Sequence, residues 1–254
     1  MEQELSFLDP QGHRVSAVLA TPNQNTNRMA VLCHGFLSGK RSTTNKTLTH
    51  LLNGQGIATF AFDFFGQGES EGPFEALTTT AAVAQATAAL DFVRQKGFIQ
   101  LGLMGSSFGG LVAILTAARQ PNLTCLALKC PVVDFAEELR LTLGDKEMAV
   151  WKSTGTIPNL MGGSDRVRLR YAFYEDCLDQ IAYGPAETIA APTLIVQGDQ
   201  DECVPLHQSQ RLAAALTCRT RLELLAGANH QFTKAEDFHR MTTLITEWLT
   251  THLA

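Results

Sequence analysis

Gly105-Ser106-Ser107-Phe108-Gly109-Gly110 stands between an apolar run with the composition of a strand and a run with the pattern of a helix. The segment matches G-x-S-x-G, with Ser107 in the middle position. A serine in so sharp a turn needs small residues two positions before and after it, because strand and helix approach closely there. The glycines supply this space. The segment therefore predicts a nucleophilic Ser107 at the carboxyl edge of a sheet, with Ser106 pointing elsewhere.

Short β-rich apolar runs alternate with longer amphipathic stretches outward from this turn. The alternation is typical of an α/β fold with a mostly parallel sheet of eight strands and helices on both faces. The first two strands are joined by Pro10-Gln11-Gly12, which is too short for a crossover helix, so they are expected to form an antiparallel edge hairpin. Strands are predicted at Leu5–Leu8, Val15–Ala20, Met29–Cys33, Ile57–Phe62, Gln100–Met104, Cys125–Lys129, Thr193–Gln197 and Arg221–Leu225. Helices are predicted at Thr43–Asn53, Leu77–Lys96, Phe108–Arg119, Leu206–Leu216 and Ala235–His252.

Residues 132–186 interrupt the alternation with mixed charges and with Gly162-Gly163. All three tyrosines of the chain and Trp151 fall inside this stretch. A solvated linker would not concentrate aromatic residues, so we expect an inserted cap over something apolar, favouring an apolar acyl or aryl group. The alternative is a cap that only pads the fold. The predicted domains are a core of residues 1–131 and 187–254 and a cap of residues 132–186.

A serine hydroxyl becomes a strong nucleophile only when a base takes its proton, so the turn requires a histidine later in the chain. His230 lies in a loop of small residues between the last predicted strand and the last predicted helix, where it can reach over the sheet edge. His207 starts a helix and is expected to be solvated. His239 and His252 fall within the terminal helix as surface or packing residues. His230 is therefore the predicted general base.

The base needs a carboxylate that fixes its tautomer, and the loop after strand Thr193–Gln197 offers three acids. Asp201 is preferred over Asp199, which directly follows the glycine at the strand end and is better placed to hydrogen-bond the turn. Asp134, after strand Cys125–Lys129, is an alternative site for the acid.

Two backbone N–H groups are expected to stabilise the oxyanion of a tetrahedral intermediate. One belongs to Phe108, at the start of the helix after Ser107. The other belongs to Phe36 in His34-Gly35-Phe36, which follows strand Met29–Cys33. His34, beside that turn, is interpreted as structural.

Five segments together resemble the α/β-hydrolase superfamily of serine hydrolases. They are His34-Gly35-Phe36, Asp63 to Ser70, the Ser107 turn, Gly198 to Pro205, and Ala228-Asn229-His230. The resemblance runs from about residue 5 to the C-terminus, with the cap unaligned. Within the superfamily, the chain is similar to bacterial carboxylesterases acting on cinnamoyl or feruloyl esters and to the serine aminopeptidase and monoacylglycerol lipase branch. Asp63 to Ser70 resembles the family's D-x-x-G-x-G-x-S turn, which shapes the sheet edge. This chain has Phe65-Gly66-Gln67-Gly68 where R-G-H-G or N-G-H-G is common, which leaves the subfamily open.

The resemblance and the residues together predict hydrolysis of small-to-medium carboxylic esters through an acyl-enzyme. An amide hydrolase of the serine aminopeptidase type is an alternative, for which Glu137-Glu138 in the cap would receive an α-ammonium; a thioesterase is another. A non-catalytic binding protein on the same fold is the alternative from a different class. The presence of serine, aspartate and histidine in the required order argues against it.

Composition excludes several other classes. The net charge of −5 leaves no basic footprint for nucleic acid. No signal-like or membrane-spanning apolar run occurs, so a cytoplasmic protein without a membrane partner is expected. The six cysteines lack a CxxC pair and are interpreted as reduced thiols. No metal motif or nucleotide-binding glycine pattern is present, so neither metal nor cofactor is predicted, and the expected partner is a small ester.

Overall fold

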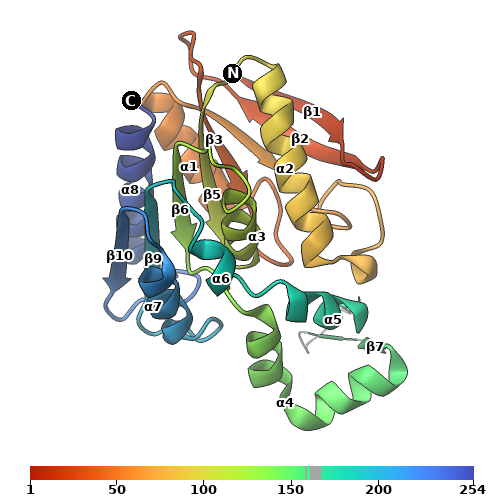
Figure 1. The fold of residues 1–254 in the computed structure, drawn as a ribbon. Helices are drawn as coiled ribbons and strands as arrows, with labels where there is room; N and C mark the ends of the chain where they lie inside the picture. The colour runs from red at the N-terminus through yellow and green to blue at the C-terminus, as the bar shows by residue number, and fades with distance from the viewer. Residues whose placement is uncertain (158, 161–166) are drawn as a thin grey trace.

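A computed structural model describes residues 1–157, 159–160 and 167–254 of the chain and shows a central sheet flanked by helices (Figure 1). The sheet has eight strands in the order β1-β2-β4-β3-β5-β6-β9-β10. This arrangement confirms the predicted α/β-hydrolase fold. Its strands are β1 (Glu2–Leu8), β2 (Arg14–Ala20), β3 (Arg28–Cys33), β4 (Ala58–Phe62), β5 (Gln100–Ser106), β6 (Cys125–Lys129), β9 (Thr193–Gly198) and β10 (Thr220–Leu225).

The direction of the strands follows from their connections. β1 and β2 form the predicted antiparallel hairpin, and β2 is also antiparallel to β4. The pairs from β4 to β10 are all parallel. Parallel strands are covered by helices on both faces, which explains why β4 and β6 are buried along their whole length.

Helices cover the two faces in separate groups. The α1 helix (Thr43–Gly54) and the α8 helix (Ala235–His252) contact each other on one face, where Leu48 and Ile245 belong to one apolar cluster. The α2 helix (Thr79–Gln95) and the α3 helix (Phe108–Ala117) pack together on the other face, whose larger apolar cluster also includes Leu212 of the α7 helix (Leu206–Ala215). All five predicted core helices are therefore confirmed, with ends that differ by a few residues.

The stretch between β6 and β9 contains α4 (Phe135–Thr154), β7 (Thr156–Ile157), β8 (Leu169–Arg170), α5 (Ala172–Asp179) and α6 (Tyr183–Ala186). Figure 1 shows α4 and α5 beyond the end of the sheet at which β5 and β6 finish. α4 bends at Gly144, which has a φ of 73° and a ψ of 168°. Gly162-Gly163 lies outside the described residues. The division into core and cap stays a prediction.

One edge strand is longer than its sequence pattern indicates. β1 begins at Glu2, and Glu2, Gln3 and Glu4 pair with Ala20, Leu19 and Val18 of β2. These polar residues are exposed, so they lack the apolar signal by which a strand is recognised. All six cysteines of the chain are free in the structure. Among the described residues, no helix is both long and apolar enough to cross a membrane.

Candidate active site

Ser107 occupies a strained turn between β5 and α3, with a φ of 54° and a ψ of −116°. Such a backbone costs roughly 1–3 kcal/mol in a residue with a side chain, so the surrounding structure must impose it. A Cβ atom on Gly105 would lie 2.2 Å from the carbonyl oxygen of Gly109, and one on Gly109 would lie 2.3 Å from that of Cys33. Both glycines are therefore required by the close approach of strand and helix, as the sequence indicates.

His230 and Asp201 form a buried hydrogen-bonded pair. The Nδ1 atom of His230 lies 2.8 Å and 2.9 Å from the two carboxylate oxygens of Asp201. Asp201 also accepts hydrogen bonds from the N–H groups of Cys203 and Val204 and from the side chain of Gln197. Burial by itself raises the pKa of Asp201, but the hydrogen bonds from His230 and the two N–H groups together hold it below its ordinary value. The carboxylate is therefore charged at neutral pH and faces the imidazole.

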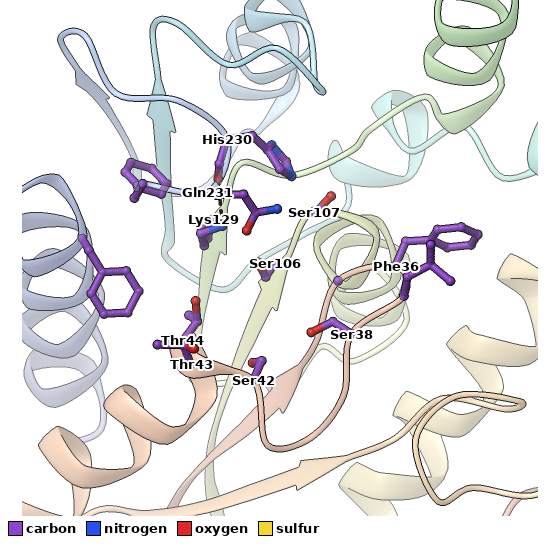
Figure 2. A pocket seen from close by; sticks show the side chains of 14 residues that line it. Phe36, Ser38, Ser42, Thr43, Thr44, Ser106, Ser107, Lys129, His230 and Gln231 are labelled. Atoms are coloured by element: carbon purple, nitrogen blue, oxygen red, sulfur yellow. Dashed lines mark hydrogen bonds between the residues drawn. The ribbon is translucent and has the colours of Figure 1, made fainter. Parts of the chain in front are cut away.

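Ser107 and His230 line one pocket of about 590 Å³. In Figure 2 the imidazole of His230 points toward the side of the pocket that holds Ser107. No hydrogen bond between the Ser107 hydroxyl and His230 appears within the described part of the chain. Such bonds are often long in an unliganded enzyme and tighten when substrate binds. The structure thus brings the predicted nucleophile and base to one cavity, and their catalytic roles stay predictions.

The competing acids have other partners. Asp199 accepts a hydrogen bond of 2.7 Å from the N–H of Gly227, so it ties the β9–α7 loop to the β10–α8 loop. Asp134 caps the N-terminus of α4 and accepts from the N–H of Glu137 at 2.8 Å. Neither carboxylate is hydrogen-bonded to His230.

The competing histidines do not line the pocket that contains Ser107. His207 is exposed at the start of α7 and contacts Glu137 at 3.0 Å, which is a partner that the sequence did not indicate. His239 is exposed on α8. His252 packs on Trp248 at a ring separation of 4.1 Å. Of these histidines, only His230 lines the pocket that contains Ser107.

His34 supports the backbone beside Ser107. Its Nδ1 donates to the carbonyl oxygen of Gly35 at 2.7 Å, and its Nε2 accepts from the N–H of Phe64 at 3.1 Å. Because the ring is buried, its pKa falls from 6.5 to about 4, although the hydrogen bond to Gly35 and the Asp63 charge oppose the shift. A neutral ring satisfies both hydrogen bonds, which agrees with the structural interpretation of His34.

The N–H groups of Phe36 and Phe108 donate no hydrogen bond to any other described residue. Their side chains belong to a group of six phenylalanine rings that contact one another between core and cap, here called the aromatic cluster. Ring centroids of neighbours are 5.2 to 6.2 Å apart. Its members are Phe36, Phe64, Phe74, Phe108, Phe135 and Phe173. The cluster therefore fixes the two loops that carry the proposed oxyanion donors.

The pocket itself is mainly polar. Its described lining comes from loops and from the ends of β5, β6, α1 and α8, and no aromatic side chain of the cap contributes to it. Trp151, Tyr171 and Tyr174 instead pack on one another inside the cap. Phe135 and Phe173 of the cap contact the rings of Phe36 and Phe108 and do not line this pocket. Aromatic content alone does not tell whether a ring faces a cavity or a neighbouring ring.

Two interactions that the sequence did not suggest hold the backbone of His230. The Nζ atom of Lys129, at the end of β6, donates to the carbonyl oxygen of His230 at 3.0 Å. A carboxylate oxygen of Glu202 accepts from the N–H of His230 at 3.1 Å. Lys129 is the last residue of an apolar strand, so the sequence around it indicates only where that strand ends.

Cys130, Asp201 and His230 place ligand-type atoms within 4.8 Å of one another, a spacing that a metal ion could use. Nδ1 of His230 is already hydrogen-bonded to Asp201. Burial raises the pKa of the Cys130 thiol well above its ordinary value, which disfavours the thiolate that metals bind. The donor set fits a His–Asp pair beside a neutral thiol better than a metal site.

The segment Asp63 to Ser70 forms a buried ionic turn. Asp63 accepts hydrogen bonds from the N–H of Lys40, from the Lys40 ammonium at 2.7 Å and from the N–H of Glu69. Gln67 stands where the family often has histidine, and neither polar atom of its buried side chain has a hydrogen-bond partner in the described structure. The turn positions the neighbouring loops and contributes no group to the pocket.

Comparisons with known proteins identify the family and the fold of this chain. The model of the family described as "Serine aminopeptidase, S33" matches residues 24–171, more than half of the chain. The mouse protein "Serine hydrolase BPHL" is 25% identical, over 84% of this chain and 77% of its own length. The structure of Est1E from Butyrivibrio proteoclasticus with bound ferulic acid has a TM-score of 0.86 at 23% identity, covering 98% of this chain and 99% of that one. A monoacylglycerol lipase from Paleococcus ferrophilus has a TM-score of 0.76 at 24% identity, covering 94% and 99%.

Proposed function

We propose that this chain, which belongs to the serine aminopeptidase S33 family and is an α/β-hydrolase serine hydrolase, cleaves small-to-medium carboxylic esters through an acyl-enzyme. The observation that carries the proposal is that His230, which is hydrogen-bonded to the buried carboxylate of Asp201, lines one pocket with Ser107, which sits on a strained turn. The lipase and the ferulic-acid complex among the structural neighbours are consistent with ester chemistry.

In the proposed first step, the Ser107 hydroxyl oxygen attacks the ester carbonyl carbon while His230 takes the hydroxyl proton. The resulting oxyanion is stabilised by the N–H groups of Phe36 and Phe108, which are uncommitted within the described structure. Collapse of the intermediate breaks the bond to the alkoxy oxygen, and His230 returns the proton to the departing alcohol. Water, deprotonated by His230, then attacks the acyl-enzyme and releases the acid and Ser107.

Asp201 acts through His230 in this scheme. With Nδ1–H donated to the carboxylate, Nε2 is left as the atom that accepts the proton from Ser107. The positive charge that then forms on the imidazole is stabilised by Asp201, whose pKa is held low in the folded protein.

The proposal is tested with 4-nitrophenyl esters of increasing acyl length and with a fluorophosphonate probe, on wild type, Ser107→Ala and Ser106→Ala. We expect turnover and labelling in the wild type, a loss of roughly 10⁴-fold or more in Ser107→Ala, and little change in Ser106→Ala. Ser106 is a matched control because it is the preceding residue and lines the same pocket. Absence of both turnover and labelling in a folded wild type, with thioesters also inert, would favour the non-catalytic alternative.

One observation favours amide hydrolysis as a second candidate. Oε2 of Glu138 on α4 is buried without a hydrogen-bond partner in the described structure, and desolvation, with the Asp201 charge adding, raises the pKa of this carboxyl to about 8. An α-ammonium of a peptide would supply a partner. Amino-acid 4-nitroanilides distinguish the candidates, with Glu138→Gln as the variant and Glu137→Gln, whose carboxylate already contacts His207 and Gln208, as the control. Fast turnover that depends on Glu138 alone would replace the ester proposal.

A further inference from the structure

The pocket beside Ser107 has a basic residue but no acidic residue in its described lining. In the part of the lining that the structure describes there is one lysine, Lys129, and no aspartate or glutamate. The chain as a whole carries a net charge of −5, so this lining differs from the average of the molecule. A cavity of this composition favours an anion over a neutral or cationic group.

Lys129 is a buried lysine without a buried counter-ion. The residue is 3% exposed, and its Nζ atom donates one hydrogen bond, to the carbonyl oxygen of His230. Nζ also lies 5.2 Å from the centre of the Phe232 ring. No described carboxylate lies within 4 Å of it, and burying an unpaired ammonium is costly. Burial accordingly lowers its pKa, although nearby acids oppose the shift.

The two nearest acids of the loop after β9 are engaged elsewhere. Asp201 accepts from His230, from two backbone N–H groups and from Gln197. Glu202 accepts from the N–H of His230. Neither forms an ion pair with Lys129, so the lysine retains N–H donors for a further acceptor.

The opposite wall of the pocket offers donors without acids. It is formed by Ser38 and by Thr43 and Thr44, the first residues of α1, and Figure 2 shows them across the cavity from Lys129. The hydroxyl groups of these three residues make no hydrogen bond to another described residue. The first turn of α1 has no acidic side chain, and the start of a helix carries a partial positive charge. Both walls therefore suit a carboxylate.

We propose that this pocket binds a carboxylate of the substrate itself, so that the preferred substrates are esters carrying a second, anionic group, such as mono-esters of dicarboxylic acids. The inference rests on the proposed function. Lys129 is the specificity-determining residue: its ammonium donates to the substrate carboxylate while its bond to His230 keeps the general base in place.

The test compares 4-nitrophenyl hydrogen adipate with methyl 4-nitrophenyl adipate, in which the second carboxyl is neutral. A second pair, 4-acetoxybenzoate and its methyl ester, places the charge on the alcohol side. Each kcat/KM is measured for wild type and Lys129→Met, and the variant-to-wild-type ratio cancels the intrinsic reactivity of each ester. We expect Lys129→Met to lower kcat/KM by about 10- to 100-fold more for the anionic member of at least one pair than for its neutral member.

Two further variants keep the test informative. Lys234→Met removes an exposed lysine whose Nζ also donates to a carbonyl oxygen of the β10–α8 loop, that of Gly227, and it should change both members of a pair equally. Thr44→Val alters the opposite wall without touching His230 and should reduce the anionic preference a few-fold, even if Lys129→Met fails to fold.

The outcomes are distinct. An equal loss on charged and neutral esters in Lys129→Met would mean that the lysine only positions His230, and it would overturn the inference. A wild type that hydrolyses neutral esters without any preference for the anionic ones would do the same and leave the esterase proposal intact. A wild type that hydrolyses no ester would overturn the proposed function itself.

Discussion

The two sides of the Ser107 turn differ in the polarity of their side chains. Toward the cap, the aromatic cluster packs ring against ring, and Phe108 and Phe173 are fully buried in it. Toward α1 and α8, the same turn borders a mainly polar pocket whose described lining includes several hydroxyl groups, Lys129 and His230. Phe36 contributes to both sides, since its ring lies in the cluster and it also lines the pocket.

The difference assigns separate tasks to the two sides. The aromatic cluster removes apolar surface from water and holds rigid the loops that carry the proposed oxyanion donors. The polar side leaves donors and the His–Asp pair accessible to a ligand. Substitutions in the cluster should therefore affect mainly stability, and substitutions near the pocket should affect mainly turnover.

The largest expected effect is on turnover. Asp201→Asn should lower kcat by about 10⁴-fold, because an amide in this place stabilises the wrong tautomer of His230. Ester hydrolysis by purified protein measures it. Asp199→Asn is the control, since Asp199 contacts Gly227 instead. A large loss in Asp199→Asn with little loss in Asp201→Asn would move the acid from Asp201 to Asp199.

The aromatic side is tested by Phe173→Ala, which should lower the free energy of unfolding by about 3–5 kcal/mol because a fully buried ring is replaced by a cavity. Urea unfolding measures the change. Phe238→Ala, at the half-buried pocket face of α8, should cost clearly less. If the folded Phe173→Ala variant kept its stability and lost its turnover, the separation of tasks would be wrong.

His34, between the two sides, should make stability depend on pH. Its pKa is about 4 in the folded protein against 6.5 ordinarily, so the unfolded chain binds more protons between these values. Stability is therefore present above about pH 6.5 and is lost as the pH falls toward 4. The contribution should be about 2 kcal/mol smaller at pH 5 than at pH 7. His34→Gln should remove this part of the dependence in urea unfolding, and an unchanged slope would contradict the assignment.

The smallest expected effect concerns a hydroxyl that lines the pocket but is already used. Ser42 caps α1, its Oγ accepting from the N–H of Asn45 at 3.2 Å. Ser42→Ala should therefore cost about 1 kcal/mol of stability and leave ester turnover nearly unchanged. Thr44→Ala, which removes a hydroxyl without such a bond, should cost less in the same unfolding assay. If Thr44→Ala lowered the stability more than Ser42→Ala, the hydrogen bond that caps the N-terminus of α1 would not be what Ser42 contributes.

The sequence by itself determined the α/β-hydrolase fold, the main strands and helices, and the order of the candidate residues. These features depend on patterns that are local in the chain: apolar runs of strand length, amphipathic repeats, and the glycines around Ser107. Crowding at that turn follows from neighbours two positions away, so it can be inferred without tertiary contacts. The exposed start of β1 escaped prediction because no local pattern marks it.

The sequence favoured Asp201 over Asp199, but only the tertiary structure shows which carboxylate meets His230 and what lines the pocket. Asp199 and Asp201 are two residues apart in one loop, and the way that loop folds directs one to Gly227 and the other to the imidazole. The pocket joins Ser38 and His230, from two distant loops, with Lys129 at the end of β6, while the cap aromatics pack on one another and on Phe36 and Phe108. Side-chain direction and long-range neighbours are set by how strands and helices pack, and no local pattern of residues carries that information.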